Sequence, residues 1–264
     1  MSVRPLAKTL LFLALAALAV LGYLFLLNVL SGQLGVFSTA VPALILALAT
    51  LALNWRFLRS EGKSLIAIGL EISPFRATQA ALGIIAGAAL VGVWMLALGG
   101  FTSVVWRVVP LSFAAAAGAF TFIVANNLAE ELAYRGYLFI LLARTYGTAV
   151  AVAVTSVLFT LLHFQAGVPL PNVVAGVLTS ALLYAAVFGR WRSVPLVLGL
   201  HVGMNFMQEL GGLRRSGLTA FAPAYEHVAS AIESSKMLFI VASINVALAM
   251  VVWLTAGNRT TPAA

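Results

Sequence analysis

Four ionisable side chains stand inside long apolar stretches of this 264-residue sequence. Glu130 and Glu131 are adjacent in one stretch, His163 lies in a second and His201 lies in a third. An ionisable group inside a bilayer costs on the order of a few kcal/mol, so it usually faces a helix-bundle interior or a cavity and marks function. These residues on three separate stretches therefore predict one buried polar site.

The spacings of the polar residues on helices suggest what each can do. Glu131 and Arg135 are four residues apart with the glutamate first, which is the favoured order for an ion pair. Glu130 points about 100° further round the same helix, so it is free to face elsewhere. His201 and Asn205 share one helix face, and an imidazole and an amide can donate hydrogen bonds to a developing oxyanion.

These side chains are the parts of a hydrolytic site without a covalent nucleophile. A positioned carboxylate can act as general base toward a water molecule, and a histidine beside the carboxylate could hold that water between them. The alternative is that His163, His201 and a glutamate bind Zn²⁺, which would activate the water. No HExxH motif is present, so zinc stays open and no other cofactor is expected.

The composition indicates the elements that must position this site. Hydrophobic residues make up 62% of the chain and charged residues 8%, whereas soluble domains carry about 25% charged residues. The apolar runs are long enough to cross a bilayer as helices and lack the alternation of barrel strands. We therefore expect an all-α polytopic integral membrane protein, a single transmembrane domain over residues 1–264, with about eight helices. The expected spans are residues 6–30, 36–57, 78–99, 111–144, 148–164, 170–188, 194–210 and 237–256.

One expected span is too long for a bilayer. A helix over residues 111–144 would measure about 50 Å, against a hydrocarbon thickness of about 30 Å. It must protrude, tilt or break, and its middle holds both glutamates. Asn126 and Asn127 lie one turn before Glu130, where they either orient it or pack against another helix.

The net charge of +8 does not indicate nucleic-acid binding. In membrane proteins lysine and arginine flank helices on the cytoplasmic side. If Arg4 and Lys8 lie inside, most other basic residues also fall inside, which predicts both termini in the cytoplasm. We expect the lipid bilayer of a bacterial inner membrane as the surroundings.

Three motifs in order resemble a known family. They are EExxxR at residues 130–135, FxxxH at 159–163 and HxxxN at 201–205, carried by a core over residues 110–210. In this order they resemble the CPBP family of intramembrane proteases, which includes the type II CAAX prenyl endopeptidases and bacteriocin-immunity proteins. By sequence convention its members are called intramembrane metalloproteases.

The resemblance implies eight helices around a conical cavity open to the cytosol. It also implies an endopeptidase acting on a membrane-associated, CAAX-like peptide or protein. Glu130 and His163 would position and activate the hydrolytic water, and His201 and Asn205 would form the oxyanion hole. Glu131 and Arg135 would support them.

Two other functions are compatible with the same residues. One is a non-catalytic bacteriocin-immunity or peptide-binding membrane protein that uses the cavity without hydrolysis. The other is a proton-coupled transporter, since buried glutamate and histidine can also relay protons. The sequence shows neither the internal repeat nor the paired broken helices typical of transporters.

Overall fold

The computed structural model describes residues 3–101, 106–214, 216–223 and 235–255. It confirms an all-α membrane protein: within these residues, seven helices are long and apolar enough to cross a bilayer. The eighth expected span is α9, which has 17 residues and runs beside α3. The α-helices are α1 (Val3–Val29), α2 (Ala40–Arg59), α3 (Pro74–Phe101), α4 (Phe113–Arg135), α5 (Tyr137–Tyr146), α6 (Thr148–Gln165), α7 (Leu170–Asn172), α8 (Thr179–Trp191), α9 (Val194–Leu210) and α11 (Ser235–Thr255). Short 3₁₀ turns are η1 (Gly35–Phe37) and η2 (Leu65–Ile68).

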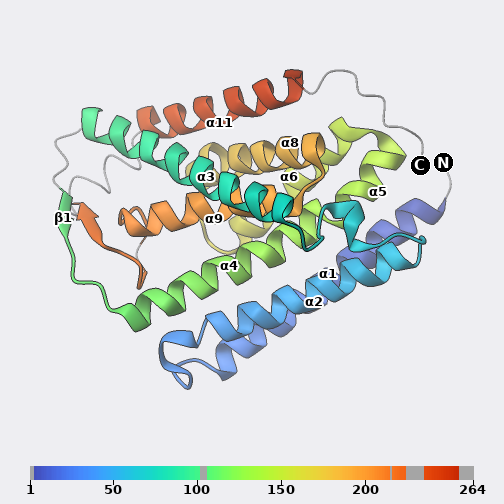
Figure 1. Cartoon of the computed structure of the whole chain (residues 1–264), viewed down its shortest axis with the longest axis horizontal. Helices are drawn as coiled ribbons and strands as arrows, with labels where there is room; N and C mark the ends of the chain where they lie inside the picture. The colour runs from blue at the N-terminus through green and yellow to red at the C-terminus, as the bar shows by residue number, and fades with distance from the viewer. Residues whose placement is uncertain (1–2, 102–105, 215, 224–234, 256–264) are drawn as a thin grey trace.

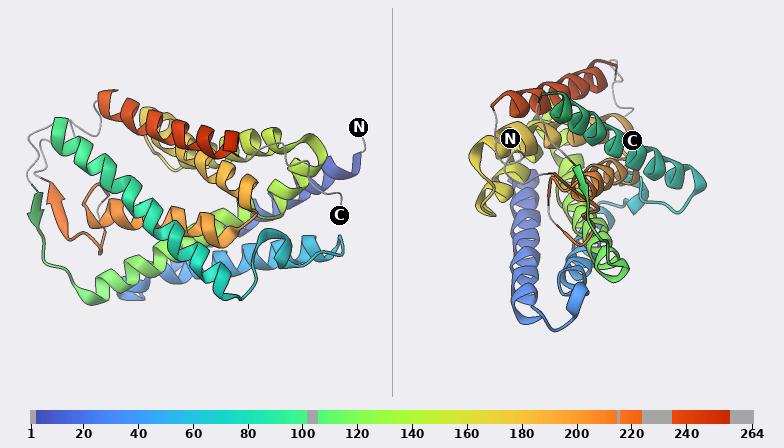
Figure 2. Two further views of the ribbon diagram at one scale, coloured as in Figure 1. Left: turned by 45° about the horizontal axis from the view of Figure 1, so that its top comes forward. Right: turned by 90° about the vertical axis from the view of Figure 1, so that its left-hand side faces the viewer.

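The helices lie side by side, and their connections alternate between two ends of the molecule (Figure 1). The α1–α2 connection and the start of α4 lie at one end, and the starts of α1 and α5 lie at the other. Helices α1 and α2 form an antiparallel pair along one edge, and α11 lies along the opposite edge (Figures 1 and 2). The helices of the expected site, α4, α6 and α9, lie between these edges.

The long expected span breaks at Gly136, between α4 and α5. Asn54 of α2 fills the break, because its amide donates to the Leu132 carbonyl at 2.9 Å and its oxygen accepts from the Tyr137 backbone N–H at 2.7 Å. A Cβ at position 136 would collide with the Asn54 oxygen. Glycine is therefore required here by the close approach of a side chain that replaces helix hydrogen bonds.

Glycines bring α3 and α9 into backbone contact. Gly83 and Gly87 on α3 face α9, and Gly199 and Gly203 on α9 face α3. A Cβ at Gly203 would collide with the backbone of Ile84. Small residues four apart let membrane helices pack closely, so this pairing fixes the helix that carries the HxxxN motif.

The expected span 170–188 is not one regular helix. It consists of α7, a π-helical turn η3 (Val173–Leu178) and α8. Helix α11 is fastened to this segment because the buried Asn245 amide donates to Thr179 and Ser180 at 3.0 and 3.1 Å. Single π-turns in helices frequently occur at functional sites.

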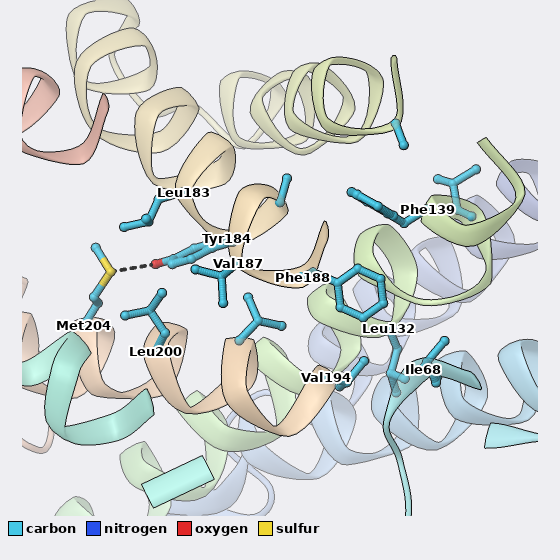
Figure 3. Close-up of a cluster of buried hydrophobic side chains, with 14 of the residues drawn as sticks. Ile68, Leu132, Phe139, Leu183, Tyr184, Val187, Phe188, Val194, Leu200 and Met204 are labelled. Atoms are coloured by element: carbon cyan, nitrogen blue, oxygen red, sulfur yellow. Dashed lines mark hydrogen bonds between the residues drawn. The ribbon is translucent and has the colours of Figure 1, made fainter. Parts of the chain in front are cut away.

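The apolar core joins α4, α5, α8 and α9 (Figure 3). Leu132, Phe139, Phe188 and Val194 are fully buried. Tyr184 extends across this core and its hydroxyl donates to the Met204 sulfur at 3.1 Å. The core thus holds α8 against α9 directly beside the polar site.

A short antiparallel ribbon closes one end of the bundle. Strand β1 (Trp106–Val108), between α3 and α4, pairs with β2 (Phe221–Pro223), which follows α9. This ribbon could not be predicted, because three-residue strands carry no recognisable alternation.

At the end of the molecule opposite the ribbon, Glu61 accepts hydrogen bonds from side chains of α1 and α5. Its carboxylate accepts from Lys8 and Tyr137 at 2.8 Å and from Arg144 at 2.7 Å. Burial alone would raise the pKa of Glu61, but these hydrogen bonds outweigh burial and lower the pKa to about 2. The ionised carboxylate therefore links α1 and α5 to the end of α2.

Candidate active site

The two adjacent glutamates occupy different environments. The side chain of Glu131 is 0% exposed, whereas that of Glu130 is 16% exposed and lines a cavity. Asn126, one turn earlier on α4, donates to Glu130 Oε1 at 2.8 Å. Of the two carboxylates, Glu130 is the one that a ligand in the cavity can reach.

Arg135 is buried beside Glu131. Its guanidinium lies 3.5 Å from Glu131 Oε1 and donates to the Ala181 carbonyl at 3.1 Å. It also lies 4.7 Å from the ring centre of Phe159, within cation–π range. The arginine thus neutralises Glu131 and joins α4 to α6 and α8.

His201 lies between the two glutamates. Its Nδ1 is 2.8 Å from Glu131 Oε1, and its Nε2 is 3.7 Å from Glu130 Oε2. Its ring also packs against Tyr184 at 4.6 Å between ring centres. A carboxylate at Nδ1 fixes the tautomer, so Nδ1 carries a proton and Nε2 faces the cavity.

His163 presents its other nitrogen to the same cavity. Nδ1 lies 2.9 Å from the Phe159 carbonyl. A carbonyl only accepts hydrogen bonds, so Nδ1 carries the proton and Nε2 is free to accept. The Phe159 ring packs against the imidazole at 4.4 Å, as the FxxxH spacing predicts.

Asn205 is held by partners on two sides. Its Nδ2 donates to Asn127 Oδ1 at 3.0 Å, and its Oδ1 accepts from Arg214 at 3.3 Å. One Nδ2 hydrogen therefore remains for a ligand. Asn126 thus contacts Glu130, and Asn127 contacts α9.

The structure brings the four expected catalytic residues to one cavity of about 320 Å³. Glu130, His163, His201 and Asn205 line it, and Glu131 and Arg135 lie behind the wall. One arrangement differs from the expectation. The imidazole next to Glu130 is His201, and within the described residues no hydrogen bond joins Glu130 to His163.

Other cavity residues were not found from the sequence. Gln208 lies two turns after His201 on the same face of α9, a spacing that could have revealed it. Trp94 and Arg214 also line the cavity. Their positions depend on the packing of α3 and on the segment after α9, which the motifs do not cover.

The zinc alternative finds no ready ligand set. Among the residues that the structure describes, no group of three His, Cys, Asp or Glu side chains is arranged to hold a metal ion. Glu131 instead pairs with Arg135 and His201, and the Nδ1 of His163 faces the Phe159 carbonyl.

The central part of the chain is similar to a known protein family. Residues 112–207, from the start of α4 to near the end of α9, match the family model of Type II CAAX prenyl endopeptidase Rce1-like proteins. This segment belongs to the CAAX-protease family. At family level, the chain is thus related to CAAX-type intramembrane proteases, in agreement with the resemblance of the three motifs. No curated protein and no solved structure matches the chain.

One residue that lines the cavity, Arg214, is exposed and lies in the segment between α9 and β2. The start of α1 lies at the end of the molecule opposite the ribbon (Figure 1). If the helices cross the bilayer between these two ends, Arg214 and the start of α1 lie on opposite sides of the membrane.

Proposed function

We propose that this protein is an intramembrane endopeptidase that hydrolyses a peptide bond of a membrane-associated, CAAX-like substrate. The observation that supports this best is the convergence of Glu130, His163, His201 and Asn205 on one cavity. The family match to CAAX endopeptidases supplies the reaction class.

In this proposal Glu130 is the general base. Glu130 takes a proton from a water molecule that also donates a hydrogen bond to His163 Nε2. The water oxygen then attacks the scissile carbonyl carbon. The C–N bond then breaks, and the proton held by Glu130 passes to the leaving amine. General acid–base catalysis of this kind contributes about 10²- to 10⁴-fold.

Asn205 and His201 are proposed to stabilise the oxyanion. Asn205 has one free amide hydrogen for this purpose. His201 already donates from Nδ1 to Glu131, so Nε2 donates only when the ring is an imidazolium. Glu131 is the anion that balances that charge, and Arg135 lies on its other side in the buried wall.

The test is cleavage by purified protein in detergent. The substrate is a fluorescent peptide with an S-prenylated cysteine fourth from its C-terminus. Glu130→Gln should lower kcat by about 10²-fold or more, while the matched control Glu71→Gln, in the loop before α3, keeps wild-type cleavage. Wild-type cleavage by Glu130→Gln would remove the assigned base. Binding without cleavage by the wild type would favour the non-catalytic alternative.

Metal dependence is tested on the same preparation. Stoichiometric zinc that is lost on chelation together with activity, and restored with it, would overturn the metal-free scheme. Full activity after chelation supports Glu130 as the group that activates water.

We further propose a bacterial inner-membrane location with both termini in the cytoplasm, so that exposed Arg214 lies on the opposite side. The chain has no cysteine, so single cysteines can report topology. A membrane-impermeant maleimide should label Arg214→Cys in intact cells and Lys63→Cys only after lysis. The reverse pattern would place Arg214 in the cytoplasm and the termini outside.

A further inference from the structure

A second cavity lies at the ribbon end of the molecule and shares only Arg214 with the candidate active site. Its volume is about 440 Å³, which is within the range of cavities that hold small ligands. Its walls come from the α1–α2 connection, the first turns of α4 and the segment after α9, which meet at this end (Figure 1). The proposed hydrolysis makes no use of this cavity.

Glycine contacts fix the walls of this second cavity. A Cβ at Gly118 would collide with the backbone of Val36, and a Cβ at Gly217 would collide with the backbone of Ala115. The α1–α2 connection and the segment after α9 are therefore both packed directly on α4. The shape of the cavity is thus set by backbone contacts.

Two opposite charges line the cavity without pairing with each other. Glu209, on α9, is only 8% exposed, and within the described residues it forms no ion pair and its Oε2 atom has no hydrogen-bond partner. Exposed Arg214 forms no ion pair in the same part of the chain and spends one donor on Asn205. A buried carboxylate without a cation costs free energy, and a guanidinium keeps further donors for an anion. Together they indicate a ligand that carries both a cation and an anion.

The surroundings of the cavity favour a lipid as the source of this ligand. When the helices cross the bilayer, the end of the bundle lies at the level of the lipid headgroups, outside the hydrocarbon core. The segments that form the cavity also expose apolar side chains, since Val36, Phe37 and Phe113 are 43%, 40% and 89% exposed. Such side chains can contact acyl chains, whereas a soluble zwitterion gains nothing from them.

We propose that this cavity binds the headgroup of a phosphatidylethanolamine-like lipid, in which a phosphate is linked to a primary ammonium group. Arg214 binds the phosphate, because its planar fork matches phosphate oxygens. Glu209 accepts hydrogen bonds from the ammonium group. This lipid site goes beyond the proposed endopeptidase function and does not depend on it.

The experiment measures lipid binding to delipidated protein in detergent by native mass spectrometry. The two probes are phosphatidylethanolamine and phosphatidylcholine with the same acyl chains, because the quaternary ammonium of phosphatidylcholine has no N–H to donate. The wild type should bind phosphatidylethanolamine about 10-fold more tightly, as expected for a hydrogen bond between charged groups. Glu209→Gln should remove this preference, and Arg214→Gln should weaken the binding of both lipids by about 10-fold.

Arg107→Gln is the matched control, because Arg107 is an exposed arginine on β1 at the same end of the molecule. It should keep both wild-type affinities. Glu209→Gln preserves the size of the side chain, so its Tm should stay close to that of the wild type; if Arg214→Gln fails to fold, Glu209→Gln decides alone.

Free phosphoethanolamine tests whether the ligand is a lipid. It should bind at least about 10-fold more weakly than the lipid, because it lacks the acyl chains. Equally tight binding of free phosphoethanolamine would refute the lipid as ligand. Equal affinity of the wild type for the two lipids, or an unchanged preference in Glu209→Gln, would refute the headgroup site.

Discussion

Breaking the buried pair between Glu131 and Arg135 should destabilise the protein strongly. Both side chains are 0% exposed, so neither can be solvated when its partner is removed. Removing one member of a buried pair costs about 3–5 kcal/mol, because an uncompensated charge stays behind. For a chain of this size that corresponds to a fall in Tm of about 6–20 °C.

A double-mutant cycle isolates the pair. Glu131→Gln leaves the guanidinium unpaired, and Arg135→Gln leaves the carboxylate with His201 alone. Arg135→Gln should be the more harmful, because it also removes the hydrogen bond to Ala181 and the contact with Phe159. The double variant removes both charges, so its loss should be smaller than the sum by about 1–3 kcal/mol.

The assay is thermal unfolding in detergent, followed by tryptophan fluorescence for all four proteins of the cycle. Arg56→Gln, an exposed arginine on α2, is the control and should leave Tm unchanged. Losses that add within about 0.5 kcal/mol would refute the coupling and with it the assignment of Glu131 as a brace.

Three further predictions concern the scaffold. Asn54→Ala should lower stability by about 2–5 kcal/mol, since it unpairs two buried backbone groups at the helix break, while the same change at exposed Asn28 should have no effect on Tm. Because the pKa of Glu61 is lowered in the folded protein, the stabilisation that its ionised carboxylate provides is complete above about pH 4.5 and is lost as the pH falls toward 2. The Tm of Glu61→Gln should therefore fall less than that of the wild type between about pH 5 and pH 3. Equal falls in Tm would contradict this prediction. Gly203→Ala should lower both Tm and the rate of cleavage, because the added Cβ pushes α9 away from α3. The control Gly92→Ala has open space at its Cβ and should change neither. Wild-type Tm and cleavage in Gly203→Ala would show that the two helices can separate at no cost.

The helices and the gathering of the site could be predicted because both are encoded locally. Apolar length specifies a span, and the low tolerance of the bilayer for charge implies that Glu130, His163 and His201 face one interior. The ion pair of Glu131 with Arg135 follows from their spacing on one helix. Each inference needs information from a single segment or from the membrane itself.

The features that could not be predicted depend on partners distant in sequence. The long span had to protrude, tilt or break, but the choice of Gly136 depends on Asn54, whose side chain replaces the missing helix hydrogen bonds. Likewise, spacing cannot show that His201 bonds to Glu131 more closely than Arg135 does, at 2.8 against 3.5 Å. Arg214 and Trp94 reach the cavity through packing that no motif records.

The support of the helix break by Asn54 has a consequence for how the chain is made. Asn54 precedes its partners Leu132 and Tyr137 by 78 and 83 residues. At about 5–20 residues per second, synthesis of that interval takes about 4–16 s. During this time the α1–α2 hairpin enters the membrane with a polar side chain whose final partners do not yet exist. A chaperone or the insertion machinery that shields α2 for those seconds would therefore raise the yield of folded protein. This dependence on shielding would arise from the Asn54 side chain.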